Sequence, residues 1–177
     1  MKLLSVAIPC YNSEAYMKKC IQSILPGGEE VEIIIVDDGS SDGTAAIADR
    51  YAEEYPTIIK AVHQENGGHG EAVNTGIRNA TGLYFKVVDS DDWLSRDAYL
   101  QALSHLEKLA KGPDTIDLFV TNFVYDKQGA TRKKVMRFNH CFPCGTKAKW
   151  REGRRTSAKF YLLLDASRVP YDHEKIG

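Results

Sequence analysis

The sequence predicts an α/β fold with a mostly parallel central sheet flanked by helices. Short apolar runs rich in β-branched residues alternate with segments of helical periodicity along the first part of the chain. The run Val31–Val36 is typical of an interior strand that helices cover on both faces. Polar clusters follow several of these runs, at the positions where open parallel sheets bind ligands.

Composition and charge narrow the class of protein. The chain has 177 residues, enough for one domain with a sizeable core, and is 43% hydrophobic and 27% charged with a net charge of -1. These values are typical of soluble globular proteins and do not indicate a nucleic-acid partner. The apolar stretch before Pro9 is too short for a signal peptide or a membrane span, so we expect a cytoplasmic location.

The four cysteines do not form an evident disulfide framework, and in a cytoplasmic setting we expect free thiols. Cys141 and Cys144 form a CxxC pair beside His140, which is half of a possible zinc site. No second pair of ligands follows the usual spacing, so zinc is the less favoured interpretation.

The expected strands share short apolar runs bounded by polar or glycine-rich segments; they are Leu3–Ile8, Val31–Val36, Ile58–His63, Leu83–Val88 and Ile116–Val124, with Val135–Phe138 returning as a hairpin. The expected helices share apolar residues at helical spacing; they run from Asn12 or Ser13 to Pro26, then over Thr44–Glu54, Glu71–Asn79 and Arg96–Lys111.

Two details of these helices can be tested. Asn12 or Ser13 should cap the first helix and Asp42 the second, because short polar side chains accept hydrogen bonds from unpaired backbone amides. The last helix should bury one leucine stripe; its members are Leu100, Leu103, Leu106 and Leu109.

The pattern weakens after Phe142. We therefore expect one domain over residues 1–142 and a basic tail of unassigned structure over 143–177, compatible with a truncated acceptor region. The basic tail is also compatible with peripheral association at the inner face of an anionic membrane.

The loop Asp37–Thr44 combines carboxylates with two glycines, which suits hydrogen bonding to a base or ribose. A tight turn that only caps the next helix is the alternative, and Asp42 fits that alternative. Asp37 and Asp38 repel each other without a partner, so a functional role is favoured for this pair.

The segment Asp89–Asp92 places three carboxylates within four residues at the end of an apolar strand. A divalent cation would offset their repulsion, and Mg²⁺ or Mn²⁺ would keep coordination positions open for water and a diphosphate. A solvated helix N-terminus is the alternative, and it suits Asp92 alone. The loop Gln64–Gly70 offers backbone amides to a phosphate or sugar, and His69 in it is read as an exposed loop histidine rather than a catalytic one.

Four motifs follow one another in order over roughly residues 1–125; they are Val6–Asn12, Ile33–Thr44, Gln64–Gly76 and Val88–Trp93. Taken together, they resemble family 2 glycosyltransferases of the GT-A fold, a Rossmann-like α/β architecture. The resemblance implies a metal-assisted, inverting glycosyltransferase that moves a sugar from a nucleotide-diphosphate donor, with uracil the expected base, to an acceptor hydroxyl. The acceptor it implies is a cell-wall or other polysaccharide, or a glycolipid.

The resemblance also assigns residues. The predicted nucleotide-binding residues lie in or beside the four motifs; they are Pro9, Tyr11, Asn12, Asp37, Asp38, Gly39, Asn66, Gly67, Asn74 and Asp89. Asp89 and Asp91 form the DxD-like pair predicted to hold Mg²⁺ or Mn²⁺, with Asp91 the better candidate for direct ligation.

Two departures from the family pattern bear on function. Val73 stands where many members carry an arginine, and Arg78 on the same helix is a candidate substitute. The general base is not recognised in this chain and is expected beyond Gly177, which makes a truncated, donor-binding but catalytically incompetent fragment the alternative function. The catalytic residue, donor sugar, acceptor identity and oligomeric state are left open.

Overall fold

The computed structural model describes residues 1–113, 116, 118–126, 134–137 and 162–165. The chain divides into two compact units: Met1–Asp117 with Leu164–Gly177, and Leu118–Leu163. The candidate zinc residues His140, Cys141 and Cys144 lie outside the described residues.

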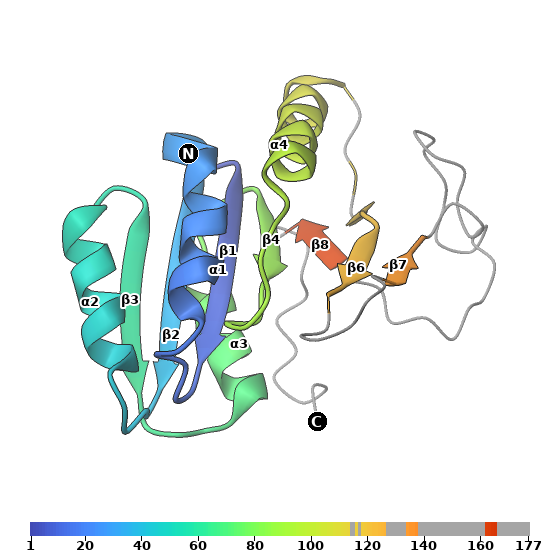
Figure 1. Ribbon diagram of the computed structural model, residues 1–177. Coiled ribbons are helices and arrows are strands. Elements are labelled where there is room, and N and C mark those ends of the chain that lie inside the picture. The colour runs from blue at the N-terminus through green and yellow to red at the C-terminus, as the bar shows by residue number, and fades with distance from the viewer. Residues whose placement is uncertain (114–115, 117, 127–133, 138–161, 166–177) are drawn as a thin grey trace. The chain divides into compact units, whose positions relative to one another are not determined.

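A parallel sheet forms the centre of the first unit (Figure 1). Its strands are β1 (Leu4–Cys10), β2 (Val31–Asp38), β3 (Ile59–Gln64) and β4 (Tyr84–Val87), in the spatial order β3-β2-β1-β4. All three neighbouring pairs are parallel, which confirms the predicted fold class.

The middle strands are buried on both faces. All of β1 is buried, and Ile33, Ile34 and Ile35 of β2 have no exposed surface. Helices on both faces explain why β2 carries a run of β-branched residues instead of an alternating pattern.

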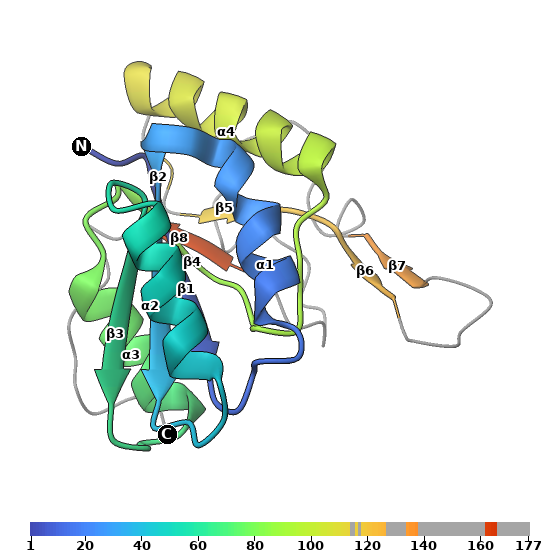
Figure 2. The ribbon, with the colours of Figure 1, turned by 60° about the vertical axis from the view of Figure 1, so that its left-hand side comes forward.

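The helices of this unit lie on the two faces of the sheet. They are α1 (Met17–Ile24), a 3₁₀ helix η1 (Leu25–Glu30), α2 (Thr44–Glu54), α3 (His69–Asn79) and α4 (Arg96–Lys111). Ala72 of α3 packs with Ile34 and Val36 of β2, whereas α1 and α2 cover the opposite face (Figure 2). Even-numbered residues of β2 therefore face α3 and odd-numbered residues face the other helices.

The predicted leucine stripe of α4 is partly wrong. Tyr99, Leu103 and Leu106 are the buried residues of this helix, while Leu100 is 37% exposed. The stripe runs i, i+4, i+7 from Tyr99, so its centre is rotated away from Leu100, and Leu109 is only half-buried.

The predicted caps need correction at α1. The helix begins at Met17 after Tyr16, without a side-chain cap, and the backbone carbonyl of Ser13 accepts from the amides of Tyr16 and Met17. Asn12 and Ser13 use their side chains elsewhere. At α2 the N-cap residue is Gly43, one position after Asp42, although the Asp42 carboxylate still accepts from the Thr44 amide at 3.0 Å.

In the second unit, the bounds of one predicted strand were wrong. The strand predicted over 116–124 is two short strands, β5 (Leu118–Val120) and β6 (Phe123–Tyr125). β6 pairs antiparallel with β7 (Lys134–Met136), which confirms the predicted hairpin pairing, while the predicted turn at 127–129 lies outside the described residues.

A strand that the sequence did not assign lies in the segment predicted as the tail. Strand β8 (Leu162–Asp165) pairs antiparallel with β4, with Leu164 opposite Phe85 and Asp165 opposite Tyr84. The boundary after residue 142 stays a prediction. Among the described residues, no helix has both the length and the apolar character needed to cross a membrane.

Candidate functional site

The loop after β1 is fastened to the loop after β2. Asn12 adopts a positive φ of 50°, and its side-chain Oδ1 accepts from the Ser41 amide at 2.9 Å. The Asn12 amide in turn donates to Oγ of Ser40 at 3.0 Å. The predicted nucleotide-binding Asn12 therefore orders the neighbouring loop with its side chain.

A second pair of bonds joins the same two loops. Oε2 of Glu14 accepts from the Gly43 amide at 2.6 Å, and the Glu14 amide donates to Oδ2 of Asp42 at 3.2 Å. The Asp42 carboxylate thus accepts hydrogen bonds both at the start of α2 and from the segment before α1.

Asp38 organises the loop after β3. This buried carboxylate accepts from the amides of Gly67 and Gly68, both at 2.8 Å, and from Nε2 of Gln64 at 2.7 Å. Gly39 has a φ of 70°, and a Cβ there would lie 2.9 Å from the Asn66 amide nitrogen. The loops after β2 and β3 are therefore in close contact, with Asp38, Gly39, Asn66 and Gly67 together.

Asp37 is bound on the opposite face of the sheet. Its Oδ1 accepts from the Ser40 amide at 3.1 Å, and Oδ2 lies 3.1 Å from Nδ1 of His63. Asp37 and Asp38 end β2, so their side chains point to opposite faces. Each carboxylate thus has partners within the protein, so the repulsion between the two does not by itself require a ligand, and their assignment to nucleotide binding stays a prediction.

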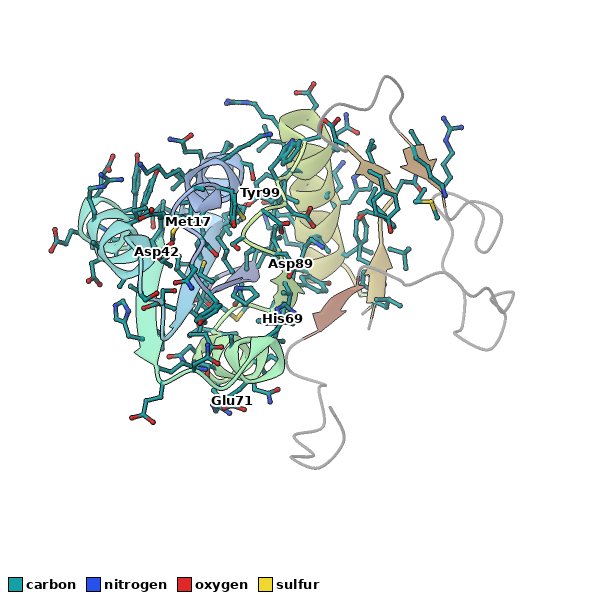
Figure 3. All side chains as sticks on the ribbon, turned by 60° about the horizontal axis from the view of Figure 1, so that its bottom comes forward. Met17, Asp42, His69, Glu71, Asp89 and Tyr99 are labelled. Atoms are coloured by element: carbon teal, nitrogen blue, oxygen red, sulfur yellow. The ribbon has the colours of Figure 1, made fainter. Side chains whose placement is uncertain are left out.

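The loop after β4 joins the same edge of the sheet. Oγ of Ser90 lies 2.8 Å from Oγ of Ser13, and the Asp89 carbonyl accepts from Sγ of Cys20 at 3.5 Å. Nε2 of His69, at the start of α3, lies 3.8 Å from Oδ1 of Asp89 (Figure 3). The loop Asp89–Asp92 (the acidic loop) is thus connected both to the loop after β1 and to the glycine-rich loop Gln64–Gly70.

The acidic loop carries a concentrated negative charge. Burial raises the pKa of Asp92, and the carboxylates of Asp91 and Asp89 raise it further, while Lys86 of β4 opposes the shift. Burial lowers the pKa of Lys86, against the opposing effect of Asp92 and Asp89. The sequence argument that these carboxylates destabilise one another therefore has an electrostatic basis.

This donor set suits a hard cation only in part. Asp91 is exposed and the Asp89 side chain is 45% exposed, so both oxygen donors are accessible. Across the ranges that the structure describes, however, no three acidic, histidine or cysteine side chains are grouped to hold a metal ion. An ion at Asp89 and Asp91 would therefore have to take most of its ligands from water or from a bound ligand.

The remaining residues singled out from the sequence are Pro9, Tyr11, Asn74 and Arg78. Pro9 is buried in β1, whereas Tyr11 is 56% exposed. Asn74 donates to Oε2 of Glu71 at 3.3 Å. Arg78, the candidate substitute for the missing arginine, donates to Oε1 of the same Glu71 at 2.5 Å. The Glu71 carboxylate therefore holds both side chains along α3.

Sequence reasoning missed three contributors: Ser90, His69 as a neighbour of Asp89, and His63. Pairing of His63 with Asp37 follows from the β2–β3 register, in which the two residues are opposite each other. Only a correct register could have revealed it, because nothing in the local pattern of β3 marks His63.

Comparison with known proteins matches this architecture to one family. The sequence model described as glycosyl transferase family 2 matches residues 5–167. The chain belongs to this family. The glycosyltransferase GlyA of Streptococcus pneumoniae is 40% identical over 101 residues, which make up 56% of this chain and 14% of GlyA.

Two solved structures share this fold. Residues 1-349 of S. aureus TarS in complex with UDP-GlcNAc superpose with a TM-score of 0.54 at 30% identity, over 62% of this chain and 32% of that one. The mannosyltransferase PcManGT from Pyrobaculum calidifontis, in complex with GDP-Man and Mn²⁺, gives 0.54 at 29% identity, over 65% of this chain and 34% of that one. The chain thus spans about a third or less of each of these proteins.

Proposed function

We propose that this chain binds a nucleotide-diphosphate sugar, with UDP as the nucleotide, at the carboxyl ends of β1 to β4. The observation that carries the proposal is the set of bonds that links all four loops at this edge: Asn12 to Ser41, Asp38 to Gly67, and Ser13 to Ser90. The complex of TarS with UDP-GlcNAc supports this choice of nucleotide. The proposed contacts come from the residues assigned to nucleotide binding above.

The proposed cation is Mg²⁺ or Mn²⁺ held by Asp89 and Asp91. When bound, it would offset the charge that develops on the leaving diphosphate. The complex of PcManGT with Mn²⁺ supports this assignment, as does the accumulation of carboxylates in the acidic loop. Ser90 and Cys20 would hold the backbone of this loop in position, through Ser13 and the Asp89 carbonyl.

The proposed reaction is transfer of the sugar to an acceptor hydroxyl with inversion at the anomeric carbon. A polysaccharide or glycolipid is the proposed acceptor, in cell-wall or other polysaccharide synthesis. The proposed location is cytoplasmic, with association at the inner face of the membrane. Transfer also needs a general base, and none is assigned among the residues that the structure describes.

Calorimetry with UDP and Mn²⁺ tests the proposal directly. We expect Asp91→Ala to weaken UDP binding in Mn²⁺ by at least about tenfold, or about 1.4 kcal/mol, because a metal ligand is lost. Asp97→Ala is the matched control, since this exposed acid of α4 should leave the affinity unchanged. Equal affinity of both variants, or UDP binding that does not depend on Mn²⁺, would refute the metal assignment.

A donor-binding chain without turnover is the second candidate function, favoured by the absence of an assigned base in the described part of the chain. Incubation with UDP-GlcNAc and Mn²⁺ separates the two candidates. Release of UDP, with or without an added acceptor, supports the transferase; tight binding without any release supports the second candidate.

A further inference from the structure

His63 of β3 lies between two carboxylates from different elements. Its Nδ1 is 3.1 Å from Oδ2 of Asp37 at the end of β2, and its Nε2 is 2.9 Å from Oδ1 of Asp49 in α2. Helix α2 and strand β3 lie side by side in both ribbon views (Figures 1 and 2). The imidazole therefore connects α2, which follows the loop Asp37–Thr44, to β2, which precedes that loop.

The two contacts of His63 specify the protonation state of its imidazole. A carboxylate can only accept a hydrogen bond, so both ring nitrogens must donate to satisfy the two contacts. Neutral imidazole carries one N–H, and only imidazolium carries two. The hydrogen bonds to Asp37 and then to Asp49 accordingly raise the pKa of His63.

The two carboxylates differ in their access to water. The Asp37 side chain is 6% exposed and that of Asp49 is 59% exposed. Water can solvate the Asp49 carboxylate, whereas the buried Asp37 carboxylate depends on hydrogen bonds and ion pairs within the protein. Among the described residues, the side-chain cation paired with Asp37 is His63.

Asp37 links His63 to the loop after β1, which in the proposed function contacts the nucleoside. Its Oδ1 accepts from the Ser40 amide, and Oγ of Ser40 accepts from the Asn12 amide. A continuous chain of hydrogen bonds thus runs from Asp49 through His63, Asp37 and Ser40 to the loop after β1.

We infer that His63 is a positioning residue for the nucleotide pocket, which as an imidazolium holds Asp37 and, through Ser40, the loop that contacts the nucleoside. The inference rests on the proposed function. The titratable groups that face His63 are Asp37 from β2 and Asp49 from α2. Loss of its proton breaks one of the two contacts, so nucleotide affinity falls as the pH rises through the raised pKa of His63.

The test measures UDP affinity of the 177-residue chain against pH at constant Mn²⁺. We expect wild-type affinity to exceed that of His63→Gln by roughly three- to tenfold at pH 6, and this ratio to fall towards one at high pH. Any pH dependence that both proteins share, including the ionisation of UDP, cancels in this ratio, so the ratio isolates His63.

A second variant keeps the test decisive if His63→Gln does not fold. Asp49→Asn removes one carboxylate from the exposed side of α2, so it should move the pH transition to lower pH while preserving affinity at low pH. Glu53→Gln, at another exposed acid of α2, is the matched control and should leave the transition in place.

The outcomes separate this inference from the proposed function. UDP binding with a pH profile that neither His63→Gln nor Asp49→Asn alters overturns the role of His63 and leaves the proposed function standing. Failure of the wild-type chain to bind UDP at any pH defeats the proposed function, and the inference with it.

Discussion

Asp38 shows how one buried carboxylate fixes a loop that local sequence preference would leave undefined. Two backbone amides and one side-chain amide donate to it, so the glycine-rich segment after β3 takes its shape around this charge. An adjacent pair of aspartates signalled a special site, but the sequence could not reveal these donors, because they lie at the end of the next strand and in the loop after it.

Replacement of Asp38 tests this role at the residue scale. Asp38→Ala leaves three donors without their acceptor, so we expect it to lower the free energy of unfolding by about 2–4 kcal/mol. Urea denaturation measures the change. Glu65→Ala, at an exposed position in the same loop, should stay within about 0.5 kcal/mol of wild type. Equal stability of the two variants would contradict the structural role of Asp38.

At the scale of elements, α4 shows why a correct helix can present an unexpected face. The leucine spacing predicted its length, but Tyr99 displaced Leu100 from the core. The Tyr99 ring packs against Gly27 of η1, where a Cβ would lie 2.3 Å from the phenolic oxygen. This contact depends on the glycine of a distant segment, which periodicity within α4 cannot report.

The same contact predicts a stabilising substitution. Among the described residues, none hydrogen-bonds the buried Tyr99 hydroxyl, and burial raises the pKa of this group. Tyr99→Phe removes this unsatisfied group and keeps the ring, so we expect a gain of about 1 kcal/mol in the free energy of unfolding. Chemical denaturation measures it, with Tyr16→Phe at an exposed site as the neutral control. A clear loss of stability in Tyr99→Phe would indicate that the hydroxyl has a partner.

For the whole molecule, the sequence predicted the parallel sheet and its helices because apolar runs and helical spacing are local signals. The bounds of α2 and α4 agree with the prediction, and β2 extends two residues further, to Asp38. Contacts set by register or by distant pairing were not predictable: His63 with Asp37, and β8 with β4. The sequence thus predicted that these loops share one edge of the sheet, whereas it did not predict the hydrogen bonds between them.

The raised pKa of His63 links overall stability to pH. A histidine with a folded-state pKa above its unfolded value contributes stability that is complete below the unfolded pKa and lost as pH rises through the folded one. We expect the melting temperature of wild type to exceed that of His63→Gln at pH 6, and the difference to shrink at higher pH. Calorimetric scans across this range check it; a difference that grows with pH would reverse the assigned charge state.

The four loops at the carboxyl ends of β1 to β4 come from successive crossovers, so no single segment of the chain contains the candidate site. A ligand that engages these loops together recognises the assembled sheet and not the unfolded chain. By mass action, its presence at about 100 times its dissociation constant would add about 2.7 kcal/mol to the folding equilibrium. If the proposed nucleotide is this ligand, its supply would also govern how much of the protein survives proteolysis.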